Sequence, residues 1–516
     1  MNKDETAPQY PSRVHEKATP MSMRRIACLF GLVPSEVRES RVLEVGCGAG
    51  ANIISLALLY PHARFKGIDE SGNAIKQARS TARKLQVKNV NFEEVTLASH
   101  EIKGRFDYIM APGIYSWIST EARRRLLGQV EIALNDNGLA YFSYNTYPGW
   151  NTPRAVRDMM VFHTRGFPDM ETKAREAKKM LNFVLANNTD VKSPYTEALQ
   201  GEAALLRDLE EYWFCKEYLS EINEPVYLAD FIAAANSNRM TYVGDMDLEY
   251  MYLGNYKELA QNQLGELTTA VRQEQYMDFI VNRRVRNTIL SKAAGVNRSV
   301  TAARLKDFRF RLRLLPKTPI SEVTYAQDVV ELMSPANQNI TANVTGTERI
   351  AFVEYMVSTH PKALSMEEIC TGAEEKAGQN MEKLLEPLQR FLVGGIASGL
   401  CICEREPDLF VLNPTEKPAV FAFAQHQSKT GVLVNNTCHQ TIRITTVDQH
   451  ILPFLDGKHE MSELVRELQK SVENGDLNIS VEGTDKDGNV PDQSQIVQAL
   501  VEERLRYYAV NALLVA

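Results

Sequence analysis

The stretch RVLEVGCGAGANI, residues 41–53, places three glycines between two apolar runs. Residues 41–45 are typical of a buried strand, and residues 51–60 are typical of a helix. The turn between them contains Gly46, Gly48 and Gly50. Glycine adopts backbone angles that other residues avoid, and it allows a ligand to approach the main chain closely. The first N–H groups of the helix point back toward the turn, so this arrangement predicts a cofactor-binding site.

Strands and helices alternate on both sides of this turn. The sequence predicts strands over 41–45, 64–69, 89–95, 106–111 and 138–145, and helices over 24–33, 51–60, 71–85 and 119–134. Alternation of this kind is typical of βαβ units. We therefore expect an α/β fold with a doubly wound, mostly parallel sheet, in a domain covering residues 1–165.

Two further domains are expected after residue 165. Residues 166–319 carry helical spacing, for example over 193–221 and 273–290, and predict a mostly helical middle domain. In residues 320–516, helices near 347–358, 365–374 and 380–399 precede LCICEREPDLFVLN (400–413), which is typical of a hairpin. Three helices and a hairpin are the outline of a winged helix, so this region is expected to be an α+β, winged-helix-like domain.

The composition of the chain argues against several classes of protein. The chain has 516 residues, of which 44% are hydrophobic and 24% charged, and no apolar stretch is long enough to span a membrane. Seven cysteines without framework spacing, and an N-terminus without an apolar core, favour a cytoplasmic protein. The nine histidines show no metal spacing, so no metal is expected.

The charge is unevenly distributed. Residues 1–165 hold 22 Lys+Arg and 16 Asp+Glu, whereas the remainder holds 36 and 49. A basic N-terminal part followed by an acidic remainder argues against nucleic-acid binding along the whole chain. A nucleic-acid partner is therefore not expected.

Residues around the glycine turn distinguish between two kinds of cofactor. A dinucleotide fingerprint has the spacing G-x-G-x-x-G, whereas this turn is G-x-G-x-G with Ala51 at the third position of the fingerprint. Glu44 would repel a pyrophosphate but would favour the ammonium and sulfonium of S-adenosylmethionine. Asp69 ends the next strand and can accept both ribose hydroxyls of either cofactor. The turn therefore favours S-adenosylmethionine over a dinucleotide, and a dehydrogenase is the weaker alternative.

The motif LEVGCGAG followed by GIDES resembles the front half of the seven-strand, class I S-adenosylmethionine-dependent methyltransferases. The resemblance implies that Gly46 and Gly48 lie against the methionine, that Asp69 holds the ribose, and that Thr96 and Leu97 lie near adenine. Many members carry an aspartate where Thr96 stands. The residues expected at the cofactor are Glu44, Gly46, Cys47, Gly48, Gly50, Asp69, Glu70, Thr96, Leu97, Ala111, Tyr144 and Asn145.

Three longer segments narrow the resemblance. MAPGIYSWIS (110–119), YFSYNTYPGWN (141–151) and YWFCKEYLSEINEPVYLADF (212–231) are similar to bacterial methyltransferases with a methyltransferase regulatory domain. That group includes rickettsial protein-lysine methyltransferases that modify outer-membrane proteins. The resemblance implies a protein substrate and a homodimer.

The aromatic residues of these segments suggest how a lysine would be handled. A lysine must lose its proton before it can accept a methyl group, and an apolar channel lowers the pKa of its ammonium by desolvation. Ring faces also attract the cation. We expect Tyr115, Trp117 and Tyr147 to form the walls of a lysine channel.

The predicted function is therefore S-adenosylmethionine-dependent methylation of protein lysines, in the cytoplasm. Two alternatives remain open at this point. One is a methyltransferase that acts on a small molecule or a nucleic acid. The other is a non-catalytic binding module with a vestigial cofactor site.

Overall fold

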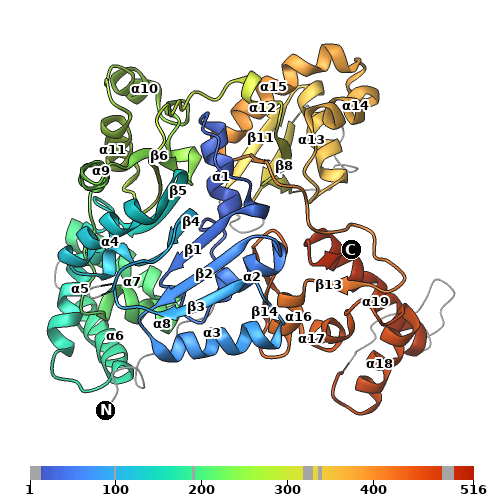
Figure 1. Cartoon of the computed structure of the whole chain (residues 1–516), viewed down its shortest axis with the longest axis horizontal. Coiled ribbons are helices and arrows are strands. Elements are labelled where there is room, and N and C mark those ends of the chain that lie inside the picture. The colour runs from blue at the N-terminus through green and yellow to red at the C-terminus, as the bar shows by residue number, and fades with distance from the viewer. Residues whose placement is uncertain (1–12, 98–99, 189–191, 318–328, 335–339, 479–492) are drawn as a thin grey trace.

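The computed structural model describes residues 13–97, 100–188, 192–317, 329–334, 340–478 and 493–516 (Figure 1). A seven-stranded sheet stands at its centre, in the order β3-β2-β1-β4-β5-β7-β6. The strands are β1 (Arg41–Val45), β2 (Arg64–Asp69), β3 (Val90–Glu94), β4 (Phe106–Ala111), β5 (Leu134–Asn145), β6 (Thr241–Asp245) and β7 (Val285–Ser291). The first five are parallel, as predicted, and β7 runs antiparallel to both of its neighbours.

Helices cover both faces of this sheet. The helices are α1 (Pro20–Leu29), α2 (Ala51–Leu59), α3 (Gly72–Lys84), α4 (Thr120–Ala133) and α9 (Leu228–Ser237). Successive strand residues point to opposite faces. Val42 packs in one core with residues of α1, α2 and α3, whereas Leu43 and Val45 pack in a second core with residues of α4 and α9. The doubly wound α/β architecture is confirmed.

Two strands of the sheet come from beyond residue 165. The segment 273–290 was expected to be one helix, but the helix α11 (Ala270–Val281) ends inside it, at Val281. Strand β7 begins four residues later, at Val285. Asn282 explains the break, because it adopts a left-handed conformation (φ 50°) that ends a helix. The sheet therefore extends into the region that was expected to be helical.

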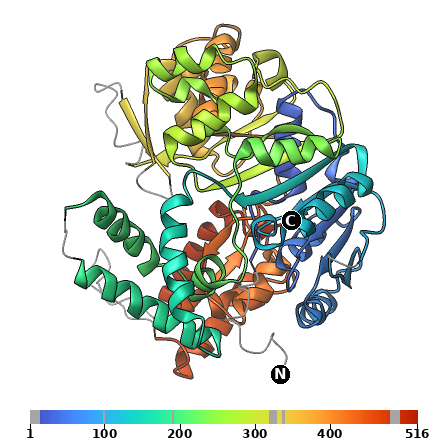
Figure 2. The ribbon, with the colours of Figure 1, turned by 90° about the vertical axis from the view of Figure 1, so that its left-hand side faces the viewer.

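Most of the rest of the middle region is helical, as predicted. It contains α6 (Met170–Asn187), α7 (Pro194–Arg207), α8 (Glu211–Phe214), a π-helical turn (Cys215–Leu219), α10 (Glu258–Gly265) and α12 (Ala302–Leu305), and α5 (Asn151–Thr164) lies just before it. Helices α5, α6 and α7 share a core of their own with the π-helical turn, and Figure 2 shows them together at one side of the molecule. Hydrogen bonds from Trp117 Nε1 to Lys216 O and from Asn145 Nδ2 to Glu217 Oε2 join the π-helical turn to the loop after β4 and to the end of β5.

The C-terminal region combines short strands with helices. Its first part contains β8 (Arg309–Leu312), β9 (Leu315–Pro316), β10 (Val329–Met333), β11 (Thr341–Thr345), α13 (Thr347–Ser358), α14 (Met366–Ala377), α15 (Met381–Ser398) and β12 (Cys401–Glu404). The three predicted helices are present, but the hairpin expected over 400–413 is wrong. Strand β12 pairs instead with β8, some ninety residues earlier in the chain.

The last part of the chain packs on the sheet domain. It contains β13 (Ala419–Val420), α16 (Ala422–Ser428), β14 (Leu433–Asn435), β15 (Thr441–Arg443), α17 (Thr446–Ile451), α18 (Met461–Glu473), α19 (Gln493–Val510) and β16 (Leu514–Val515). His439, between β14 and β15, lies 2.8 Å from the Asn52 side chain of α2. Figure 1 shows α16 beside α2, and the two helices are in contact.

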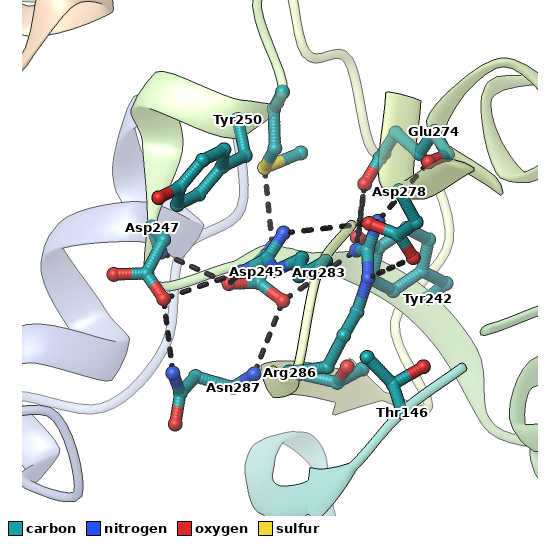
Figure 3. A network of polar contacts seen from close by, with 12 residues as sticks. Thr146, Tyr242, Asp245, Asp247, Tyr250, Glu274, Asp278, Arg283, Arg286 and Asn287 are labelled. Atoms are coloured by element: carbon teal, nitrogen blue, oxygen red, sulfur yellow. Dashed lines mark hydrogen bonds and ion pairs between the residues drawn. The ribbon is translucent and has the colours of Figure 1, made fainter. Parts of the chain in front are cut away.

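A buried network of charges ties α11 to β6 and β7 (Figure 3). Arg286 has no exposed surface, and its guanidinium lies 2.8 Å from Asp278 and 3.0 Å from Glu274. Arg283 lies 2.7 Å from Asp245. Burial raises the pKa of Asp245 and of Asp278, and the two guanidinium groups oppose this effect. The arginines therefore favour the charged form of these carboxylates, against the effect of burial.

Replacement of Arg286 tests this network. Arg286→Met would leave buried carboxylates without their counter-charge, at a cost of about 3–5 kcal/mol. We expect a clear fall in the urea midpoint and in Tm. Arg390→Met, which removes an exposed ion pair with Glu386, should cost less than about 1 kcal/mol. Equal effects of the two substitutions would contradict a stabilising role for the network.

Candidate active site

The glycine turn closes against the end of β2. Gly46, Gly48 and Gly50 have φ angles of 70°, 52° and 82°, which side chains disfavour. Gly46 N donates to Ile68 O at 2.7 Å, and Gly48 N donates to Asp69 Oδ2 at 2.8 Å. The other oxygen of Asp69 accepts from Ser71 N at 2.9 Å. Asp69 therefore joins the turn to the beginning of α3.

A cavity of about 1020 Å³ opens at this turn, along the carboxyl ends of β1, β2, β3 and β4. Open α/β sheets bind their ligands at this edge. Seven of the predicted site residues line it: Gly46, Gly48, Asp69, Glu70, Thr96, Leu97 and Trp117. A Cβ at Gly46 would lie 2.2 Å from Cδ1 of Ile114, which also lines the cavity. The backbone at Gly46 must therefore stay bare.

Glu44 does not line this cavity. Its side chain leaves β1 on the face covered by α2, where Oε1 accepts from Asn52 Nδ2 at 2.9 Å. Oε2 has no hydrogen-bond partner among the described residues. Burial raises the pKa of Glu44 to about 8. The prediction that its carboxylate faces the cofactor is therefore not supported, since alternation along β1 turns it the other way.

Three more predicted residues serve packing and are absent from the cavity lining. Cys47 was expected to face the ligand, but its Sγ lies against Gly67, at 2.8 Å from the position of a Cβ there. A Cβ on Gly50 would lie 3.0 Å from Phe92, so this glycine allows α2 and β3 to approach. Ala111 is fully buried in the core that includes α4.

The aromatic residues after β4 and β5 separate into two groups. Trp117 lines the cavity. Tyr115 and Tyr144 are buried against Phe231 of α9, with ring centroids 4.9 and 4.4 Å away, and do not line it. Tyr147 packs on Tyr227 at 5.3 Å and also lies outside the lining. Of the three residues expected to form the walls of a lysine channel, only Trp117 therefore lines the cavity.

Asn145 does not line the cavity, but it supports segments that do. Its Nδ2 donates to Glu217 Oε2 at 2.9 Å and to Asn223 Oδ1 at 3.1 Å, and its backbone N donates to Ser116 Oγ at 2.8 Å. These bonds join the end of β5 to the loop after β4 and to the π-helical turn. Asn145 therefore positions the segment that carries the cavity's remaining wall.

That wall comes from residues that sequence reasoning missed, namely Tyr212, Lys216 and Ile222. Lys216 Nζ donates to Gly113 O at 3.1 Å and lies 4.7 Å from the ring centre of Trp117. Trp117 Nε1 in turn donates to Lys216 O at 3.1 Å. The aromatic residues of 212–231 were the only sequence signal for this wall. A π-helical turn departs from α-helical spacing, so that spacing does not indicate which side chains face the cavity.

Comparisons with known proteins agree with this geometry. Family models described as "Methyltransferase domain", "Predicted methyltransferase regulatory domain" and "PKMT, C-terminal winged helix domain" match residues 36–184, 210–292 and 416–513. A Rickettsia prowazekii protein named "Uncharacterized protein RP789" is 30% identical over 98% of this chain and 92% of its own length. The chain belongs to the S-adenosylmethionine-dependent methyltransferases with a regulatory domain.

Solved structures support the same assignment for this methyltransferase. PKMT2 from Rickettsia typhi is 28% identical, with a TM-score of 0.87, over 98% of this chain and all of its own. A second structure holds PKMT2 in complex with AdoHcy. The winged-helix match begins at residue 416, so the predicted winged helix exists but lies after the segment 347–413 from which it was inferred.

The cavity of this methyltransferase fits S-adenosylmethionine, which supplies an electrophilic methyl group on a sulfonium. The bare turn at Gly46 and Gly48 allows close approach of the ligand, and the carboxylate of Asp69, which is the group expected to hold the ribose, lines the same cavity. A carboxylate at the end of β2 serves the ribose of either cofactor, so the spacing of the glycines, and not Asp69, argues against a dinucleotide.

In the part of the chain that the structure describes, no three His, Cys, Asp or Glu side chains gather as metal ligands. Within the same residues, no helix is both long and apolar enough to cross a bilayer.

Asp69→Asn should weaken the binding of S-adenosylmethionine by about tenfold to a hundredfold, because hydrogen bonds to a charged acceptor contribute about 1.5–3 kcal/mol. Titration calorimetry measures this change. Glu93→Gln, on the neighbouring strand and outside the cavity, is the matched control and should bind normally. Unchanged affinity of the Asp69 variant would remove this residue from the site.

Glu44→Gln should stabilise the protein in a pH-dependent manner. The native pKa of about 8 exceeds the ordinary value of 4.5, so the native state holds a proton that the unfolded chain releases. The wild type therefore loses stability as pH rises from about 4.5 to about 8, and the glutamine variant does not. Thermal unfolding at pH 5 and pH 8.5 should show a Tm gap that widens with pH; a constant gap would contradict it.

Proposed function

We propose that this methyltransferase modifies lysine side chains of protein substrates. The observation that carries the proposal is the aromatic and carbonyl environment opposite the glycine turn. Trp117 and the carbonyl of Gly113 already hold the ammonium of Lys216, whose Nζ lies 4.7 Å from the ring centre and 3.1 Å from the carbonyl oxygen. An acceptor lysine needs the same two features, a ring face for its cation and an acceptor for its N–H.

The chemistry of the wall favours an amine acceptor. A lysine in this cavity loses part of its hydration, and burial indeed lowers the pKa of Lys216. A larger fraction of neutral amine at neutral pH follows, and only the neutral amine has a lone pair for methyl transfer. The protein's contribution is therefore to hold, desolvate and orient the amine.

Similarity to PKMT2 and to the winged-helix family supports a protein as the substrate. Outer-membrane or surface proteins are the substrates suggested by the sequence resemblance. The homodimer and the cytoplasmic location stay predictions, and size-exclusion chromatography with light scattering tests the dimer.

Transfer of a radioactive methyl group tests the proposal. The purified full-length chain is incubated with labelled S-adenosylmethionine and with separate protein, RNA and small-molecule fractions of cell extract. We expect label in the protein fraction, recovered as methyllysine after hydrolysis. Label confined to RNA or to small molecules would refute the lysine proposal, and absence of transfer to any fraction would favour a vestigial site.

Trp117 offers a more local test. Trp117→Ala should lower kcat/KM for a lysine-containing substrate by about threefold to thirtyfold, since a cation–π contact contributes about 0.5–2 kcal/mol. Trp117→Phe retains a ring face and should recover part of that loss. Steady-state kinetics at saturating cofactor measures both variants. A phenylalanine variant no better than the alanine variant would contradict a role for the ring.

A further inference from the structure

Lys216 is a lysine of the chain itself, and it lines the cavity that contains the glycine turn. We propose that Lys216 is an internal methyl acceptor, which the enzyme methylates on its own chain. This inference rests on the proposed function, because it requires that the cavity transfers methyl groups to lysine. It adds a modification site within the regulatory segment 210–292.

The first support is the position of the ammonium group. Lys216 lines the same cavity as Gly46, Gly48 and Asp69. Its Nζ lies over two indole rings, 4.7 Å from the centre of Trp117 and 5.5 Å from that of Trp213. A third contact, to Gly113 O at 3.1 Å, comes from the loop that follows β4. The ammonium therefore has three contacts with the protein, two to ring faces and one to a carbonyl oxygen.

The second support is the backbone that delivers this side chain. Residues Cys215–Leu219 form a π-helical turn directly after α8. π-Helical turns are rare, and they often occur at functional sites because they change which side chains face a ligand. Trp117 Nε1 fixes the turn by donating to Lys216 O. The turn is also held through Glu217, which accepts from Asn145 Nδ2.

The charges around Lys216 allow both of its protonation states. Burial lowers its pKa, and the carboxylates of Glu217 and Asp69 act in the opposite direction. His15, whose pKa falls to about 4 through burial and the charge of Lys216, is neutral and adds no competing charge. The amine therefore becomes neutral more readily than an exposed lysine, while the indole faces still hold it.

The transfer step balances without a further reactant. The Lys216 ammonium first releases one proton to water. The lone pair of the neutral nitrogen then forms a bond to the methyl carbon of S-adenosylmethionine, and the carbon–sulfur bond breaks with its electron pair going to sulfur. The positive charge passes from sulfur to nitrogen, which leaves methylated Lys216 and S-adenosylhomocysteine.

Peptide mass spectrometry tests the inference on the full-length chain. The protein is analysed as purified, and again after incubation with S-adenosylmethionine that carries a deuterated methyl group. We expect methyl on Lys216, approaching one modified residue per chain, at a rate that does not depend on protein concentration. Lys178, which lies over the ring of Phe214 but outside the cavity, should remain unmodified.

Two variants separate this inference from the proposed function. Lys216→Arg should abolish labelling of the peptide, and Lys178→Arg should leave it intact. Labelling of added protein lysines without labelling of Lys216 would overturn the inference and leave the proposed function standing. A labelling rate that rises with protein concentration would also overturn it, because transfer would then occur between chains. Absence of methyl transfer to Lys216 and to added proteins alike would refute both the inference and the proposed function.

A measurement without cofactor checks the geometry independently. Lys216→Met removes the cation from the indoles of Trp117 and Trp213, so the tryptophan emission spectrum should shift relative to the wild type. Lys178→Met should leave the spectrum unchanged. Identical spectra for the Lys216 variant and the wild type would show that the ammonium does not lie on these rings, and would overturn the inference.

Discussion

The bend between β1 and α2 depends on a backbone conformation that glycine adopts without strain. Gly46 and Gly48 have positive φ angles, and Asp69 fixes the bend by accepting from Gly48 N at 2.8 Å. This bond and the one from Gly46 N to Ile68 O join the ends of β1 and β2, and the cavity opens at this turn. The remaining walls of the site, from the loop after β4 and from the π-helical turn, are arranged around this fixed point.

The regulatory segment contributes both to the sheet and to the site. Its β6 and β7 complete the seven strands, and the buried charges of Arg283 and Arg286 hold them to α11. The same segment carries Lys216 into the cavity. A domain boundary drawn between the catalytic and regulatory parts would therefore divide one sheet and one site. A change of conformation in this segment would move residues that line the cavity.

Much of the fold could be predicted from local patterns, and the errors have physical causes. The five parallel strands and their helices follow from alternation and from caps such as Ser119. β7 was missed because its apolar residues continue the helical spacing of α11, and only Asn282 marks the break. Glu44 was expected at the cofactor because its carboxylate would favour a cationic ligand, whereas strand alternation puts its side chain on the face of Val42 and outside the cavity lining. Lys216 could not be predicted because a π-helical turn changes the spacing.

A crystal structure with S-adenosylhomocysteine is the most direct test of the central claim. The account predicts the homocysteine moiety against Gly46 and Gly48, and both ribose hydroxyls on Asp69. The sulfur should face the side of the cavity that carries Trp117 and Lys216. A ligand bound elsewhere, or bound with its sulfur turned away from that wall, would contradict the account.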